Sequence, residues 1–184
     1  AGMESSLVSS GHAYVNRRLE SKFNQSGWIS EHLFGVSQFS FLKKLLEEID
    51  SDWDSVESRL KEIQEFLFSQ DNLVLDITST NQEYDVVQNR LHWLIDTMPE
   101  VNPEKQTWNF IPDGNDEGLI APMQVNYVGK GANIFEAGYS LNGSISVIQN
   151  YVRTTYLWDK IRIQGGAYGA FMSFSPASGT MNLL

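Results

Sequence analysis

The hydrophobic period changes along the chain, and this change constrains the fold more than any other feature. In the first hundred residues apolar side chains recur at helical spacing, which predicts helices at 4–25, 36–50, 53–68 and 81–98. In the last third the pattern alternates between turn residues, as is typical of strands. Helices and strands in mixed order, ending in a hairpin, predict an α+β fold in which an antiparallel-rich sheet packs with helices.

Strands are predicted where apolar and polar residues alternate between turn residues. Four segments meet this description: 72–79, 122–128, 166–176 and 180–184. Turns are expected at residues 129–131 and 177–179, since both contain glycine. A long helix is expected between the two groups of strands, at residues 141–161.

The chain is expected to contain parts of two domains. Residues 1–100 are predicted to be the mostly helical end of one domain, and residues 122–184 the start of a second, truncated one. Residues 101–121 combine prolines, glycine and acidic residues, which indicates a linker. No polar tail follows the last predicted strand, so we expect the chain to be a piece of a longer protein.

Composition excludes several classes of partner and site. The net charge is −10, which argues against binding to nucleic acid or to an anionic membrane surface. No apolar run reaches the roughly 18 residues of a membrane span. The chain has no cysteine, so it contains neither a disulfide nor a thiolate metal site. At 41% hydrophobic residues it can still bury a core.

The three histidines predict no metal site. His12, His32 and His92 lie in different segments, whereas helical metal ligands are spaced three to five residues apart. The string WISEH, residues 28–32, ends like the zinc motif H-x-x-E-H, but Trp28 stands at its first ligand position. We therefore expect no metal-binding residue in this chain.

The stretch WDKIRIQGGAYGAF, residues 158–171, contains the candidate functional residues. Arg162 offers a rigid fork of donors that suits a carboxylate or peptide carbonyls. The hydroxyl of Tyr168 can donate to an oxyanion, and Gly165 and Gly166 permit close approach of a ligand backbone. The residues alone equally allow a surface arginine at a helix C-terminus followed by a core tyrosine on a strand.

Three segments resemble the pitrilysin/insulysin-type inverzincin metallopeptidases. The segment YVRTTYLWDKIRIQGGAYGAFMSF resembles the C-terminal half of these peptide-degrading zinc enzymes, and VNYVGKGANIFEAGY resembles the start of their last domain. The long segment that begins SGHAYVNRRLESKF resembles the preceding region. The resemblance implies four homologous α+β domains in two halves that enclose a chamber.

The same resemblance implies roles for the candidate residues. Arg162 and Tyr168 match the arginine and tyrosine that reach the substrate, so the arginine is implied to hold the substrate backbone and the tyrosine to bond the scissile carbonyl. Zinc, the H-x-x-E-H motif and the catalytic glutamate are implied to belong to the N-terminal catalytic half of the same protein. The implied partners are peptide substrates and that half. Without the motif, this chain alone is expected to be inactive and to hold no cofactor.

Two other functions stay open at this point. One is an inactive peptidase homologue that acts as a binding subunit, and the other is a purely structural interaction protein. The parent is expected to be cytoplasmic if it is bacterial, or to lie in the mitochondrial or plastid matrix if it is eukaryotic.

Overall fold

The computed structural model describes residues 2–101, 107, 109–111 and 113–184. Contacts within the chain divide it into two compact units, Ala1–Lys43 with Asn109–Leu184, and Lys44–Trp108. Most of the predicted linker at 101–121 is described, but residues 102–106, 108 and 112 of it lie outside the described residues. The division by contacts does not test the domain boundaries expected from the sequence, which stay a prediction.

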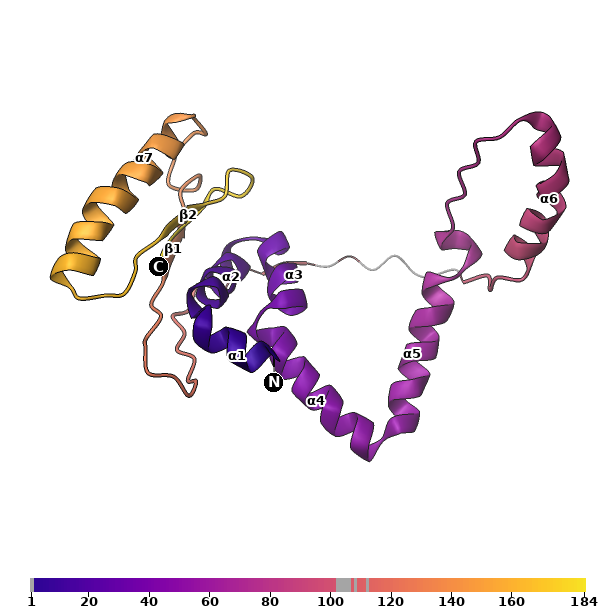
Figure 1. Ribbon diagram of the computed structural model, residues 1–184, viewed down its shortest axis with the longest axis horizontal. Helices are drawn as coiled ribbons and strands as arrows, with labels where there is room; N and C mark the ends of the chain where they lie inside the picture. Colours follow the sequence, from indigo (N-terminus) through magenta and orange to yellow (C-terminus); the bar gives the residue numbers. More distant parts are fainter. Residues whose placement is uncertain (1, 102–106, 108, 112) are drawn as a thin grey trace. The chain divides into compact units, whose positions relative to one another are not determined.

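Helices form most of the regular structure (Figure 1). In the described residues the α-helices are α1 (Gly2–Ser9), α2 (Gly11–Phe23), α3 (Gln25–Phe34), α4 (Val36–Ser51), α5 (Trp53–Leu67), α6 (Asn81–Asp96) and α7 (Ser144–Val152). A short 3₁₀ helix, η1 (Gln70–Asn72), follows α5, and a π-helix, η2 (Arg153–Gln164), continues α7. The predicted helices at 36–50, 53–68 and 81–98 are confirmed to within a few residues.

A small antiparallel sheet lies in the first unit. Its strands are β1 (Lys130–Asn133), β2 (Met172–Phe174) and β3 (Thr180–Leu183), in the order β1-β3-β2. The hairpin of β2 and β3 is confirmed, with Ser173 opposite Asn182, and the turn uses Gly179 at a φ of +75°. Seven α-helices and one three-stranded sheet in the described residues confirm the α+β class.

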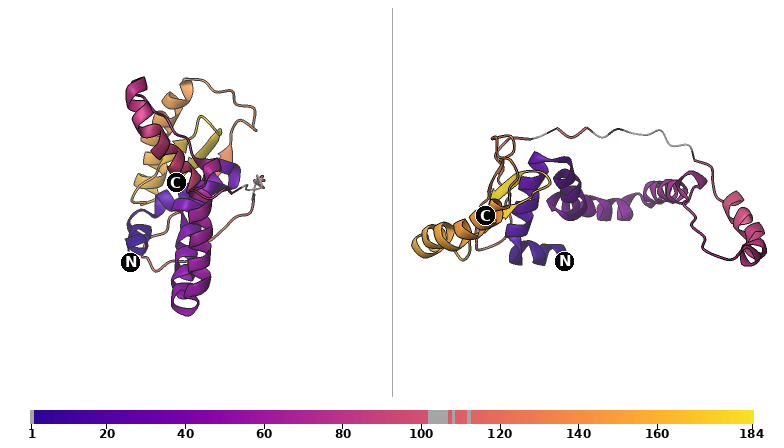
Figure 2. Two further views of the ribbon diagram at one scale, coloured as in Figure 1. Left: turned by 90° about the vertical axis from the view of Figure 1, so that its right-hand side faces the viewer. Right: turned by 90° about the horizontal axis from the view of Figure 1, so that it is seen from above.

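The sheet lies between two helices, α2 on one side and α7 on the other (Figures 1 and 2). Its face toward α2 is polar, because Ser173 and Asn182 both bond to a side chain of that helix. Successive strand residues point to opposite faces, so Met172 belongs to the other face. Met172, Ile145 of α7 and Leu157 of η2 are all less than 9% exposed and form the small apolar core.

The predicted strand at 122–128 is wrong, and so is the turn at 129–131. Described residues before 130 form no strand in this segment, and β1 begins at Lys130 instead. Gly131 lies opposite Asn182 of β3, where a side chain would clash with that amide and with the ring of Phe23. This glycine therefore allows close packing of a strand and does not form a turn.

The predicted single helix at 4–25 is divided in the structure. A break at Ser10 separates α1 from α2, and Asn24 ends α2 and begins α3. The side chain of Asn24 accepts a hydrogen bond from the amide of Gly27 at 2.7 Å, as an N-cap residue does. The helical period continues through both breaks, so periodicity alone did not reveal them.

Local capping fixes the helices of the second unit. Asp52 caps α5 by accepting from the amide of Ser55, and Thr80 and Glu83 form a capping box at the start of α6. The carboxyl of Glu83 accepts hydrogen bonds from the amide and the hydroxyl of Thr80, and these bonds lower its pKa.

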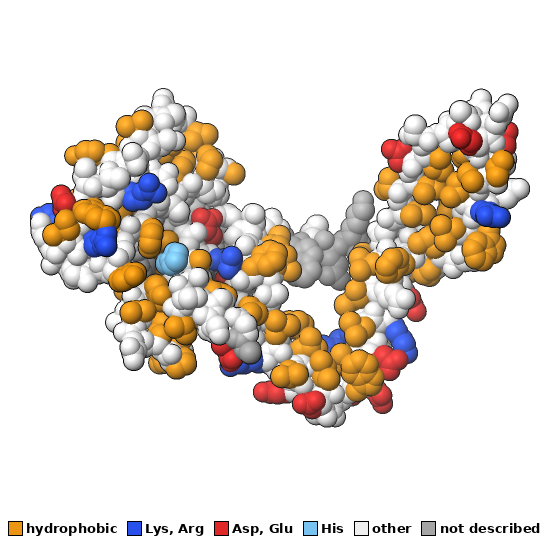
Figure 3. Space-filling view, viewed as in Figure 1, with side chains coloured by type: hydrophobic (Ala, Val, Ile, Leu, Met, Phe, Trp, Pro, Cys, Tyr) orange, Lys and Arg blue, Asp and Glu red, His pale blue; other side chains and the backbone are white. Residues whose placement is uncertain are grey.

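The predicted strand at 72–79 is wrong. Residues 73–80 form no strand, since the one sheet in the described part of the chain contains only β1, β2 and β3. Val74 in this segment is 91% exposed, so alternation without a partner strand gave no burial. Figure 3 shows how much apolar surface the helices also leave exposed.

Candidate functional site

A helix with an unusual hydrogen-bond pattern positions Arg162. At Arg153 the α-helical pattern of α7 gives way to the π-helix η2, which extends to Gln164. The hydroxyls of Thr154 and Thr155 bond back to the carbonyls four residues earlier, at 2.8 and 2.6 Å. Such bonds compete with the backbone for these carbonyls and bend helices, so they give a local reason for the change. π-helical turns are frequent at functional sites.

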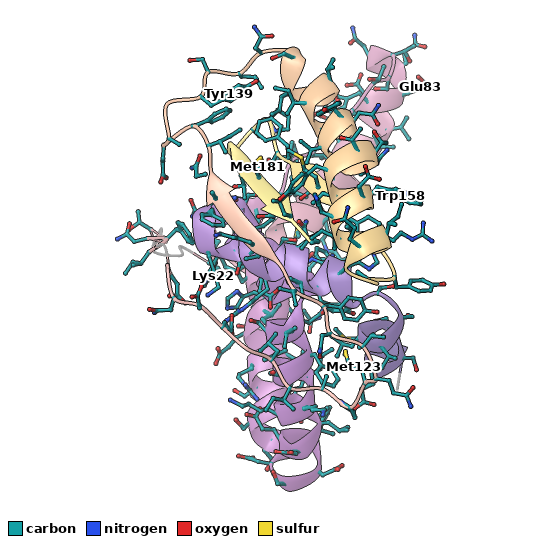
Figure 4. The ribbon with its side chains drawn as sticks, turned by 90° about the vertical axis from the view of Figure 1, so that its left-hand side faces the viewer. Lys22, Glu83, Met123, Tyr139, Trp158 and Met181 are labelled. Atoms are coloured by element: carbon teal, nitrogen blue, oxygen red, sulfur yellow. The ribbon has the colours of Figure 1, made fainter. Side chains whose placement is uncertain are left out.

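Arg162 lies in the last turn of η2 and is exposed. Its guanidinium carbon lies 4.2 Å from the centroid of the Trp158 ring, and Figure 4 shows Trp158 on this helix. No carboxylate in the described part of the chain forms an ion pair with Arg162 within 4.0 Å. A positive charge at this end of a helix is favourable to the backbone dipole. The donors of the guanidinium therefore stay available to a ligand.

Gly165 and Gly166 end the helix. Gly166 has a φ of +73°, the left-handed conformation that glycine adopts without strain. Its amide donates to the carbonyl of Arg162 at 3.1 Å, and the next amide, of Ala167, donates to the carbonyl of Ile161 at 3.1 Å. These nested bonds resemble a Schellman motif widened by one residue, as a π-helix requires. A side chain at Gly165 would come within 2.6 Å of the Ile161 carbonyl.

The two glycines thus have a folding role that the sequence reasoning missed. We expected them to admit a ligand backbone, whereas the structure uses them to turn the chain after η2. The position of Gly166 is also open, with no atom within 4 Å of where a β-carbon would lie. The same turn that ends the helix therefore leaves free space beside the candidate residues.

Tyr168 lies directly after this turn and is 98% exposed. It precedes β2 and lies on no strand, so the alternative of a core tyrosine on a strand is wrong. Three residues later the chain is fixed, because Phe171 exchanges two backbone hydrogen bonds with Leu184, at 2.8 and 2.9 Å. The ring of Phe171 also stacks on His12 of α2, with centroids 5.0 Å apart.

A network of polar side chains fixes α2 to the sheet beside this site. Asn16 accepts from the hydroxyl of Ser173 at 2.7 Å and from the amide of Asn182 at 2.9 Å. Asn24 donates to the hydroxyl of Thr180 at 3.3 Å. Thr180 and Asn182 are fully buried. Sequence reasoning missed this network, although polar residues at two alternate positions of β3 were a signal that one sheet face is polar.

A group of charged residues joins α2 to residues 113–117. Arg18 donates to both carboxylate oxygens of Glu117, at 2.7 and 2.9 Å, and this pair raises the pKa of Arg18 and lowers that of Glu117. Arg18 also lies 3.7 Å from the fully buried Glu31, which accepts a hydrogen bond from the amide of Ser37. These charges pair with one another, which indicates a structural role.

The histidines do not form a metal site. His12 stacks on Phe171, Nδ1 of His32 lies 2.9 Å from the carbonyl of Trp28, and His92 lies on α6. Within the described residues no three His, Asp or Glu side chains gather as ligands for a metal ion. The residues present therefore do not fit the zinc that the resemblance implies for the parent protein. No described helix has the length and apolar character needed to cross a membrane.

Two family models match the chain. Residues 1–45 match a region described as associated with group C of the M16 peptidases, and residues 116–184 match the PreP C-terminal domain. The matched regions contain α2 and the sheet on which it packs, together with η2 and the turn before Tyr168. The fold and the site therefore define a segment of a peptidase of this group.

Individual relatives agree with these models. The chain is 37% identical to presequence protease 1, chloroplastic/mitochondrial, of Arabidopsis thaliana, over 100% of this chain and 17% of the plant protein. It is 28% identical to protein HypA of Clostridium perfringens, over 95% of this chain and 18% of the relative. It is 24% identical to the mitochondrial presequence protease of Saccharomyces cerevisiae, over 95% and 19%. The chain belongs to the presequence protease family, and it spans less than a fifth of the length of these relatives.

Proposed function

We propose that this chain is a substrate-binding part of a longer zinc metallopeptidase that degrades peptides. In this proposal Arg162 binds the backbone of the substrate, and Tyr168 donates a hydrogen bond to the scissile carbonyl. Zinc and the residues that hold it belong to the N-terminal half of the whole protein, where they supply the chemistry of hydrolysis. The family membership supports this division, because the relatives named as proteases are more than five times as long as their match to this chain.

The observation that carries the proposal is the state of the two side chains. The guanidinium of Arg162 has no carboxylate partner in the described part of the chain, and Tyr168 is 98% exposed. Both flank a glycine turn with open space beside it. An unpaired guanidinium fork and a free phenol hydroxyl are the donors that peptide carbonyls require.

Each donor is expected to affect a different kinetic constant. The tyrosine hydroxyl bonds an oxygen whose negative charge develops in the transition state, so its loss lowers kcat. One such donor is typically worth on the order of a hundredfold in rate. The arginine holds the substrate backbone in the ground state as well, so its loss raises KM.

The test is steady-state kinetics of the full-length peptidase on a fluorogenic peptide. Tyr168→Phe is expected to lower kcat by about a hundredfold, and Arg162→Ala to raise KM. Tyr156→Phe and Arg153→Ala are matched controls, since both are exposed residues of η2 and neither belongs to the proposed site. Circular dichroism checks the folding of each variant. If Tyr168→Phe and Arg162→Ala both keep the parental constants in folded protein, the proposed function is wrong.

A further inference from the structure

Trp158 lies under the one side chain of the proposed site that must keep its donors free. The ring and the guanidinium of Arg162 come from the same helix four residues apart, and the separation of 4.2 Å is that of a stacked cation–π pair. The Trp158 side chain is 46% exposed, so burial in the core does not account for its placement.

Stacking and ion pairing restrain an arginine in different ways. A carboxylate bonds the edge of the guanidinium and uses the N–H donors that a substrate would need. An aromatic ring contacts the face of the guanidinium and leaves the donors around its edge free. Trp158 can therefore restrict the rotamers of Arg162 at no cost in hydrogen-bonding capacity.

The other cation–ring pairs of the described residues differ from this one. Arg17 lies 5.8 Å from the ring of Tyr14, but it also donates to a backbone carbonyl at 2.7 Å. Lys43 lies 4.4 Å from the ring of Phe39, but it also pairs with a glutamate at 3.6 Å. Among these three cations in the described chain, Arg162 is held by a ring alone. This difference indicates that the guanidinium is kept oriented and unoccupied.

We infer that Trp158 is a positioning residue for peptide binding, which holds the guanidinium of Arg162 flat and directs its free N–H edge toward the substrate backbone. This inference rests on the proposed function of Arg162. Trp158 itself makes no bond with the substrate in this arrangement. It lowers the entropy that Arg162 loses on binding, because fewer rotamers remain to be lost.

The test is a double-mutant cycle in the full-length peptidase, with KM and kcat measured separately. Trp158→Leu is expected to raise KM about two- to fivefold, the value of an exposed cation–π contact, and to leave kcat unchanged. Trp158→Phe keeps an aromatic face and is expected to restore most of the affinity. Tyr156→Leu is the matched control, as another exposed aromatic residue of η2. Trp158→Met replaces Trp158→Leu if that variant does not fold.

The cycle separates this inference from the proposed function. In an Arg162→Ala background, Trp158→Leu is expected to change KM no further, because the ring then has no guanidinium to hold. If Arg162→Ala raises KM while Trp158→Leu does not, or if the two effects add fully, the inference is overturned and the role of Arg162 stands. If Arg162→Ala itself leaves KM unchanged, the proposed function fails, and the inference fails with it.

Discussion

Replacement of Asn16 by leucine is expected to loosen the attachment of α2 to the sheet. The side-chain oxygen of Asn16 accepts from the hydroxyl of Ser173 at 2.7 Å and from the amide of Asn182 at 2.9 Å. Leucine has nearly the same shape and no acceptor, so both donors lose their partner. The structure offers no replacement for Asn182, whose side chain is fully buried and cannot reach water.

The two donors contribute unequally to the loss. Leaving a buried donor without a partner costs about 1–3 kcal/mol, which applies to Asn182. Ser173 is half-buried and its hydroxyl can rotate toward water, so its bond is worth about 0.5–1 kcal/mol. The sum of about 2–3 kcal/mol corresponds to a rise of roughly thirtyfold or more in local opening. Asn16→Asp keeps the accepting oxygen, and its cost is expected to stay below about 1 kcal/mol.

The assay is amide hydrogen exchange in β2 and β3 of the full-length protein, followed by mass spectrometry. Asn89→Leu is the matched control, because Asn89 is an exposed helical asparagine with no side-chain hydrogen bond to another described residue. Exchange in the two strands should accelerate in Asn16→Leu and stay near the parental rate in Asn16→Asp and in the control. Equal acceleration in the leucine and aspartate variants would refute the reasoning, since one of them retains the acceptor.

Two further predictions concern the same unit. Gly131→Ala is expected to destabilise β1 by about 1–3 kcal/mol, because the methyl group would clash with Asn182, whereas Gly118→Ala, where space is open, serves as the control in the same exchange measurement. Glu20→Gln is expected to flatten the pH dependence of thermal stability between pH 4 and 7. Burial raises the pKa of the Glu20 carboxyl above its ordinary value of 4.5, so its favourable contribution is present below that value and is lost as the pH rises through the folded pKa. A glutamine variant with the same slope as the parent would contradict this assignment.

The helices that the sequence predicted well are those whose ends are fixed by near neighbours. Asp52 accepts from an amide three residues ahead, and Thr80 and Glu83 complete a capping box between themselves. Helical hydrogen bonds join residues four apart, so the period and the caps contain nearly all the information needed. The β2–β3 hairpin was predictable for the same reason, since Gly179 closes a short turn.

Strands away from the hairpin could not be placed from their own residues. The segment at 72–79 alternates as a strand should, but it has no partner in the described part of the chain. β1 forms instead around Gly131, because only there do the side chains of Asn182 and Phe23 approach closely enough to require a glycine. A strand is stable only with its neighbour, and the neighbour of β1 lies some fifty residues further along the chain.

The same division holds for the candidate site. Arg162 and Tyr168 could be selected from the sequence, because a guanidinium and a phenol on either side of two glycines carry recognisable chemistry. Tertiary structure decided that Tyr168 is exposed and that Asn16, more than 150 residues away in sequence, anchors the following strand. Trp158 gave no signal of its own, since an aromatic residue in a helix is commonly part of a core. Residue chemistry is local, whereas burial and partnership depend on which distant segments the fold brings together.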